Sequence, residues 1–345
     1  MSGEERATRK NVAVALQGGA AHGAFSWGVL DRLLEDGRIG IEGVSGTSSG
    51  AINAALLAYG SDRSGPSGAR SVMDRFWRRI SEESEKRRWT AHMLLRLMRL
   101  RAVRISRKPA FFDVMSRILL PYRFDPETMN PMREVLAEHV DFEALRAASD
   151  GIKLFLNATN IATVKNRVFA RDEVSLDAVL ASSCLPFLFD AVEIDGERYW
   201  DGGYMGNPTI YPLIYECETP DIVLILTAPL TKRPVPQNSA EILARISEVS
   251  FTSTLMREMR AIAFVTGLVE KGLVAKEAGL KKINIHLIAP PGDDPDFEVE
   301  QRFNASWPFV SAMRDRGRAA AGTWLETCYD RVGRESSFEI DDAFV

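Results

Sequence analysis

A serine stands between two glycines at a point where the apolar pattern of the sequence changes. Gly46 and Gly50 enclose the motif, and Ser48 is its central residue. The short apolar segment 41–45 predicts a buried strand, and the alanine-rich segment 51–59 predicts a helix. A serine at such a strand-to-helix turn projects its hydroxyl from a strained backbone, and glycines avoid collisions on either side. The pattern predicts Ser48 as a nucleophile; the alternative is a serine that only caps the helix.

A glycine-rich loop follows the first predicted strand, 12–16, and opens the first predicted helix. It reads Gly18-Gly19-Ala20-Ala21-His22-Gly23. Backbone N–H groups at a helix N-terminus attract anions and can stabilise the oxyanion that forms when a serine attacks an ester. We therefore expect Gly18, Gly19 and Ala20 to form an oxyanion hole, with Gly23 supporting the loop. A dinucleotide-binding loop is the rival interpretation, but the glycine spacing does not fit the G-x-G-x-x-G pattern.

An aspartate followed by two glycines supplies the third candidate site. Asp201, Gly202 and Gly203 follow a predicted hairpin arm at 198–200. Alone, such a triplet indicates an ordinary turn, but a nucleophilic serine also needs a base. We therefore predict Asp201 as the base, with Gly202 and Gly203 in support. Because an ordinary aspartate, with a pKa of ~3.9, is a weak base, we expect partial desolvation to raise its pKa.

The four histidines are weaker candidates for the base. His22 lies in the glycine-rich loop, His92 and His139 lie on predicted charged helices, and His286 lies in an apolar predicted strand. Only His286 has the Ser, Asp, His chain order of an α/β-hydrolase triad. Segment 284–288 alternates polar and apolar residues, so we expect His286 to face a surface or a satisfied polar site. A triad that uses His286 remains an open alternative.

Together, the three blocks resemble those of patatin-like phospholipases, in particular the bacterial members. Three further segments carry the resemblance: 157–160 (NATN), 181–186 (ASSCLP) and 199–204 (YWDGGY). The resemblance implies a catalytic dyad of Ser48 and Asp201, no catalytic metal, and hydrolysis of lipid acyl esters. It also implies an α/β fold, a three-layer α/β/α sandwich with a mostly parallel central sheet and a helical cap. We expect no cofactor.

Two residues depart from the family pattern. Ala20 replaces the third glycine of the loop, and alanine disfavours positive φ, so we expect the loop to donate if Ala20 has negative φ. His22 replaces an arginine and thus a fixed positive charge that would favour a phosphate headgroup. These departures affect the substrate more than the mechanism. Acyl transfer to an alcohol through the same acyl-enzyme, and a non-catalytic lipid-binding protein, remain further alternatives.

The elements that must position these residues alternate along the chain. Strand, helix, strand and helix within residues 12–60 predict parallel strands, with a ligand site at their carboxyl ends. Further strands are predicted at 152–158, 167–170, 222–227 and 283–288, and a hairpin at 192–194 and 198–200. A polar loop is predicted at 61–68, and helices at 71–109, 239–267 and 307–332. We expect one domain over residues 1–345, with core blocks 12–60 and 150–230, a helical insertion at about 68–148 and a C-terminal helical elaboration at about 238–332.

Composition narrows the class of function. The net charge of −4 argues against general nucleic-acid binding, which requires a clustered basic excess. Three widely spaced cysteines suit neither a disulfide framework nor a metal cluster, so we expect reduced thiols. The apolar run 12–30 contains Gln17, His22 and glycines, so we expect it to belong to the fold rather than to a signal peptide. We expect a cytoplasmic location, with any membrane contact peripheral and at the inner membrane surface.

One segment departs from the overall acidic balance. Residues 86–108 contain nine Lys or Arg and no Asp or Glu, among several apolar residues. Such a segment could contact anionic lipid and bring the chain to a lipid or acyl-ester substrate. Its arginines spread around the helical wheel, however, so a cap helix that pairs with Glu82, Glu83 and Glu85 is the alternative.

Overall fold

Alternate residues of the first strand face two separate hydrophobic cores. In β1 (Lys10–Leu16), Val12, Val14 and Leu16 pack in one core, and the two alanines between them pack in the other. Side chains along a strand alternate between the two faces of its sheet, so β1 is buried on both sides. Such a strand is typical of a parallel sheet with helices on both faces.

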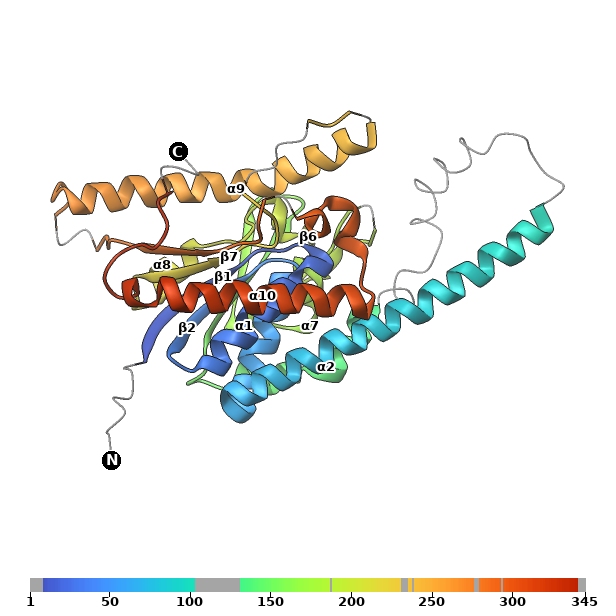
Figure 1. Cartoon of the computed structure of the whole chain (residues 1–345), viewed down its shortest axis with the longest axis horizontal. Coiled ribbons are helices and arrows are strands. Elements are labelled where there is room, and N and C mark those ends of the chain that lie inside the picture. The colour runs from blue at the N-terminus through green and yellow to red at the C-terminus, as the bar shows by residue number, and fades with distance from the viewer. Residues whose placement is uncertain are drawn as a thin grey trace.

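The structure, a computed structural model, has this three-layer arrangement (Figure 1). It describes residues 9–102, 131–186, 188–230, 235–237, 239–275, 279–292 and 294–340. One core contains residues of α1 (Gly23–Asp36), α2 (Ser49–Ala102) and α10 (Trp307–Thr327). The other contains residues of α8 (Tyr211–Glu216) and α9 (Ser239–Glu270). The predicted α/β/α sandwich is confirmed.

The sheet has eight strands, and its centre is parallel. Seven strands follow the order β5-β6-β3-β2-β1-β7-β8, and β4 pairs with β3. The strands parallel to β1 are β2 (Ile39–Gly46), β3 (Lys153–Asn160), β7 (Asp221–Ile225) and β8 (Asn284–Ile288). The antiparallel strands are β4 (Asn166–Ala170), β5 (Val192–Ile194) and β6 (Glu197–Asp201). Every strand predicted from the sequence is present, with shifts at the ends.

The helices agree with the sequence except at one predicted loop. Residues 61–68 were expected to form a polar loop, but α2 continues through them, and only Ser64 and Gly65 leave helical geometry. Gly65 has a φ of 61°, and Pro66 follows it at the start of the continuing helix, where proline is tolerated. The loop is therefore a kink between two helices. The predicted closing helix also ends early, at Thr327, and a 3-10 turn follows at Tyr329–Arg331.

Shorter helices complete the described part of the insertion and the site. They are α5 (Pro131–His139), α6 (Phe142–Ala147) and α7 (Leu176–Ser182). The side chains of residues 87–102, and residues 103–108 altogether, lie outside the described residues, so both interpretations of the basic segment stay predictions. Among the described helices, none combines the length and apolar character needed to cross a bilayer.

The sheet brings the three sequence blocks to one edge. Leu16 at the end of β1 pairs with Gly46 at the end of β2, so the glycine-rich loop and the serine motif leave the sheet side by side. Asp201 ends β6 and pairs with Ala158, two residues beyond the partner of Gly46 on β3. Ligand sites in such sheets lie at the carboxyl ends of the parallel strands.

Candidate active site

Ser48 lies in a turn that only a special backbone conformation allows. Its φ is 55°, in the left-handed region that costs a non-glycine residue about 1 kcal/mol. A Cβ atom on Gly46 would lie 2.3 Å from the Gly50 carbonyl oxygen, and one on Gly50 would lie 2.2 Å from that of Leu16. The Ser48 N–H donates to Ser182 Oγ at 2.9 Å, which ties the turn to α7. The strained strand-to-helix turn predicted from the sequence is confirmed.

Asp201 is completely buried at the end of β6. Its Oδ1 accepts the Gly203 N–H at 2.8 Å, whereas Oδ2 has no hydrogen-bond partner among the described residues. Burial raises the pKa of Asp201 to about 7, although the Gly203 N–H and the Ser48 hydroxyl partly oppose this shift. Because the Ser48 hydroxyl lowers this pKa, it lies close to the Asp201 carboxylate. The desolvated aspartate expected from the sequence is present, beside Ser48.

The backbone around Asp201 leaves it little freedom. Its N–H donates to the Cys184 carbonyl at 2.8 Å, and its own carbonyl accepts the Thr159 hydroxyl at 2.8 Å. A Cβ atom on Gly202 would lie 2.2 Å from the Asn157 carbonyl oxygen, and one on Gly203 would lie 2.3 Å from the Phe251 ring. The two glycines after Asp201 are thus required by close packing.

Asn157 is a positioning residue that sequence reasoning missed. It is buried in β3, and its Nδ2 donates to the carbonyls of Gly202 and Gly206 at 3.1 Å each. Its Oδ1 lies 2.6 Å from the Thr47 hydroxyl, in the serine motif. One side chain thus connects the serine turn to the loop after Asp201. An amide in the otherwise buried strand 153–160 was the available signal, because buried polar groups need partners.

The glycine-rich loop lies against Ser48, but two of its predicted donors already have partners. A Cβ atom on Gly18 would be 2.7 Å from Ser48 Cβ. The Gly18 N–H donates to Asn207 Oδ1 at 2.7 Å, and the Gly19 N–H donates to Ser49 Oγ at 2.9 Å. Both amides would have to share or exchange these side-chain acceptors to bind an oxyanion.

Ala20 does not meet the condition, a negative φ, on which donation by the loop was expected. Its φ is 52°, so it adopts the left-handed conformation that alanine was expected to avoid. The loop keeps the backbone path that a glycine would allow, at a cost of about 1 kcal/mol. No hydrogen bond from the Ala20 N–H occurs within the described residues. Of the three predicted donors, Ala20 is thus the one whose amide is not already engaged.

His22 does not occupy a headgroup position. It is fully buried, its Nε2 lies 3.0 Å from the Asp296 carbonyl oxygen, and its ring packs 5.4 Å from that of Phe297 and 6.0 Å from that of Phe309. The absence of a positive charge at this position therefore says little about headgroup preference. Its role is to anchor the 3-10 turn Pro295–Phe297 below the loop.

His286 is held in a separate polar cluster. Its Nε2 lies 3.0 Å from Asp221 Oδ1, and its Nδ1 lies 2.9 Å from Ser337 Oγ. The expected satisfied polar site is confirmed, and His286 lines neither pocket at Ser48. His139 is also engaged, through Nδ1 and the Val135 carbonyl at 2.7 Å. Within the described residues, no three His, Cys, Asp or Glu side chains are grouped to hold a metal ion.

Two pockets meet at Ser48. The larger has a volume of about 350 Å³, and its lining is mostly apolar, including Ile52, Phe76, Trp77 and Ile80. The smaller, of about 140 Å³, contains Asp201 and the glycine-rich loop. Ala20, Ser48, Leu185, Arg302 and Phe303 line both pockets. The nucleophile candidate thus stands at the junction of an apolar cavity and a smaller cavity that contains the buried carboxylate.

A family model of patatin-like phospholipases matches residues 14–214 of the sequence, more than half of the chain. The chain belongs to the patatin-like phospholipase family. It is therefore a lipid acyl hydrolase that acts on ester bonds, at the level that the family defines. The match begins inside β1 and ends inside α8, so it includes all three sequence blocks.

Comparison with solved structures finds more distant similarity. VipD from Legionella pneumophila is 16% identical, with a TM-score of 0.39 over 92% of this chain and 67% of that one. The ExoU–SpcU complex of Pseudomonas aeruginosa gives 17% identity and a TM-score of 0.40 over 95% of this chain and 53% of that one. At such TM-scores neither likeness carries weight for function. No curated protein matches the chain.

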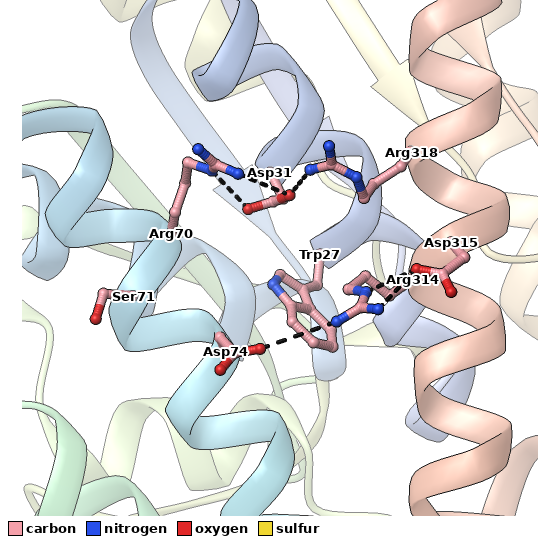
Figure 2. Close-up of a pocket in the computed structure, with 8 residues that line it drawn as sticks. All are labelled: Trp27, Asp31, Arg70, Ser71, Asp74, Arg314, Asp315 and Arg318. Carbon is pink, nitrogen blue, oxygen red and sulfur yellow. Dashed lines mark hydrogen bonds and ion pairs between the residues drawn. The ribbon is translucent and has the colours of Figure 1, made fainter.

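A third cavity of this patatin-like chain, of about 390 Å³, lies among α1, α2 and α10, away from Ser48 (Figure 2). Asp31 on α1 pairs there with Arg70 of α2 and Arg318 of α10. The Arg314 guanidinium lies 5.3 Å from the Trp27 ring centroid and 2.8 Å from Asp315. The charged side chains that line this cavity pair with one another, so the cavity marks an ion-pair network that joins three helices.

Proposed function

We propose that this chain cleaves lipid esters through an acyl-enzyme on Ser48, with Asp201 as the base. The observation that carries the proposal is a buried carboxylate with a pKa of about 7, beside a serine hydroxyl where two pockets meet. A general base is most effective when its pKa lies near the working pH. Ser48 and Asp201 line the same pocket, which is the arrangement that proton transfer between them requires.

In the first step, Ser48 Oγ attacks the acyl carbonyl carbon while its proton moves to Asp201 Oδ2, the oxygen without another partner among the described residues. The tetrahedral intermediate then expels the alcohol, which takes the proton from Asp201. Water attacks the acyl-enzyme, again giving a proton to Asp201, and the fatty acid leaves as Ser48 recovers that proton. Asp201 thus acts alternately as base and acid and ends each cycle ionised.

The negative charge on the carbonyl oxygen needs donors at the glycine-rich loop. We infer that the Ala20 N–H is the first of these, since the described part of the loop presents it without an existing partner. The amides of Gly18 and Gly19 join it when Asn207 and Ser49 release them. One such donor typically contributes about 3 kcal/mol to transition-state stabilisation.

Arg302 favours a substrate that carries a negative charge near its ester. It is the cationic residue that lines both pockets, and Glu248 on α9 holds it through a 3.6 Å ion pair. An acyl chain in the apolar pocket would leave a phosphodiester near this guanidinium, and arginine binds phosphate well. A phospholipid, rather than a neutral acylglycerol, is therefore the substrate that the pocket chemistry supports.

Covalent labelling tests the nucleophile. A fluorophosphonate probe should modify the native chain once, on the peptide that contains Ser48, and should not modify the Ser48→Ala variant. Ser71→Ala, at an exposed position on α2, serves as the matched control and should label like the native chain. Labelling of Ser48→Ala at the native rate would contradict the proposal.

The substrate is tested with Arg302→Gln in mixed micelles. We expect hydrolysis of a phospholipid to fall about tenfold, while hydrolysis of a diacylglycerol with the same acyl chains changes little. Arg257→Gln, an exposed arginine on α9 outside both pockets, is the control. Equal losses on both lipids would show that Arg302 supports the pocket and does not select the headgroup.

A further inference from the structure

Helix α9 has one face packed on the sheet and another exposed. Leu255, Met259 and Ile262 are buried in the core on that side of the sheet. In the N-terminal half of the helix, Ile242, Ile246 and Val249 are 46%, 58% and 60% exposed. Their spacing of four and three residues places them on one face of the helix. An apolar stripe therefore faces away from the core.

An ion pair links the helix that carries this stripe to the mouth of the pocket at Ser48. Val249 follows Glu248, which forms an ion pair with Arg302. Phe303, which follows Arg302 in sequence, is 63% exposed and lines both pockets. Leu188, 47% exposed, lines the larger pocket as well. We call these five apolar residues the docking face: Leu188, Ile242, Ile246, Val249 and Phe303.

The same helix also reaches the catalytic site with its other side. Phe251 and Thr252 line the smaller pocket beside Asp201. Because the apolar stripe and these two residues belong to one helix, the stripe could not be repositioned without moving the site itself. The orientation of the docking face therefore sets the orientation of the pocket mouth.

The sequence of a second helix at this pocket favours an anionic surface as the occupant. Ile80 and Ser84 of α2 line the larger pocket, and α2 then continues to Ala102. The last part of α2, residues 86–102, contains six Lys or Arg and no Asp or Glu. Figure 1 shows α2 extending from the body on the side where the N-terminal end of α9 lies. An apolar face in a chain that also has a basic segment is typical of binding to anionic lipid surfaces.

We propose that the docking face inserts into the surface of a lipid aggregate and turns the pocket mouth at Ser48 toward its acyl chains. The lipid nature of the occupant rests on the proposed function. Insertion removes apolar side chains from water, and an acyl chain then enters the 350 Å³ pocket without crossing a water layer. The docking face thus couples binding of the lipid surface to access to the nucleophile.

Vesicle binding tests the proposal without any turnover. Ser48→Ala protein is sedimented with vesicles of phosphatidylcholine and phosphatidylglycerol in a ratio of about 4:1, and compared with the same protein carrying Ile246→Asn and Val249→Asn. We expect the apparent partition coefficient to fall about tenfold, as for loss of two partly buried aliphatic side chains. Thermal unfolding should show unchanged midpoints, because both side chains are exposed.

Leu273→Asn is the matched control. Leu273 is 69% exposed and follows the C-terminal end of α9, roughly 40 Å along the helix from Ile246. Binding of this variant should equal that of the parent. If Leu273→Asn lowers binding as much as the double variant, or if neither lowers it, the docking face is not the contact surface.

Two further results separate this proposal from others. If the double variant binds vesicles normally but changes from dimer to monomer in size-exclusion chromatography, the face is a protein interface and the proposal is overturned. If the native chain fails to hydrolyse a soluble ester while the double variant still loses vesicle binding, the proposed function fails and the docking face stands. The two ideas can therefore fail separately.

Discussion

Two buried aspartates, Asp201 and Asp221, lie at opposite ends of strands in the same sheet. Asp201 is the last residue of β6, near the carboxyl ends of the parallel strands, and Asp221 is the first residue of β7. Their exposed fractions are 0% and 2%. Despite similar burial, the pKa of Asp201 is raised to about 7 and the pKa of Asp221 is lowered.

The number of donors explains the difference. Burial raises the pKa of Asp221 as well, but its carboxylate accepts His286 Nε2 at 3.0 Å, Asn284 Nδ2 at 3.1 Å and the Gly333 N–H at 2.9 Å, which together outweigh burial. Asp201 accepts one backbone N–H at regular geometry. A carboxylate with three donors stabilises the fold, whereas one with a single regular donor retains the basicity that chemistry needs.

The largest difference between the two should appear in turnover. Asp201→Asn removes the proposed base, so kcat on a soluble p-nitrophenyl ester should fall about a thousandfold or more. Asp221→Asn should keep kcat within about threefold at a temperature where the variant is folded. Comparable losses in the two variants would remove the distinction between a catalytic and a structural aspartate.

The fold and the meeting of the three blocks could be predicted because local patterns were strong. The apolar strands 12–16 and 41–45 and the glycines after them placed both loops at one sheet edge. The sequence could not show that the break at Ser64 and Gly65 is only two residues long. A Gly/Ser/Pro cluster has the same composition whether it forms a loop or a short break in a helix.

Details that depend on contacts across the chain were beyond sequence reasoning. The side chains that accept hydrogen bonds from the loop amides are Asn207 and Ser49. No local sequence pattern connects either residue to the loop. The intrinsic preference of alanine favours negative φ and could not show that Ala20 has a φ of 52° in the packed loop. His22 was assessed as the loss of a fixed positive charge near the headgroup, whereas packing makes it part of the core.

For stability, in contrast to turnover, the loss should come from replacing Asp221 and not from replacing Asp201. Asp221→Asn weakens three hydrogen bonds to a buried carboxylate and should lower the free energy of unfolding by about 3 kcal/mol at pH 8. Asp201 binds its proton more tightly when folded, so its contribution to stability falls as pH rises from about 4 to about 7. Asp201→Asn should therefore increase stability at pH 8, by about 1.4 kcal/mol for each tenfold difference in proton affinity between the folded and unfolded chains.

Urea unfolding of both variants at pH 5 and pH 8 measures this contrast. The gain from Asp201→Asn should be larger at pH 8 than at pH 5, where the native carboxyl is largely protonated. For Asp221, with a lowered pKa, the native contribution is present at both pH values and is lost only under more acidic conditions. A destabilised Asp201→Asn variant at pH 8 would contradict a raised pKa for Asp201.

The pH dependence of turnover sharpens the assignment of the base. Ionised Asp201 accepts the serine proton, so kcat/KM should rise about tenfold per pH unit below pH 7 and level off above it. Glu258 is a useful control, because burial also raises its pKa to about 7 while it caps α8 by accepting the Ile210 N–H at 2.8 Å. Glu258→Gln should leave the pH profile of kcat/KM unchanged. If this variant shifts the acidic limb of the profile, the titrating group is Glu258 and not Asp201.

The smallest effect on turnover is expected at His286, the partner of the structural aspartate. His286→Gln keeps a side-chain donor for Asp221 and should change kcat less than about twofold, with a stability loss of about 1 kcal/mol. A serine hydrolase triad would instead lose several orders of magnitude without its histidine. A loss of that size in a variant with a native unfolding transition would mean that His286 reaches Ser48 in another conformation. Unchanged kcat, together with an inactive Asp201→Asn variant, would leave the carboxylate as the base, because His286 is engaged by Asp221 and not by Asp201.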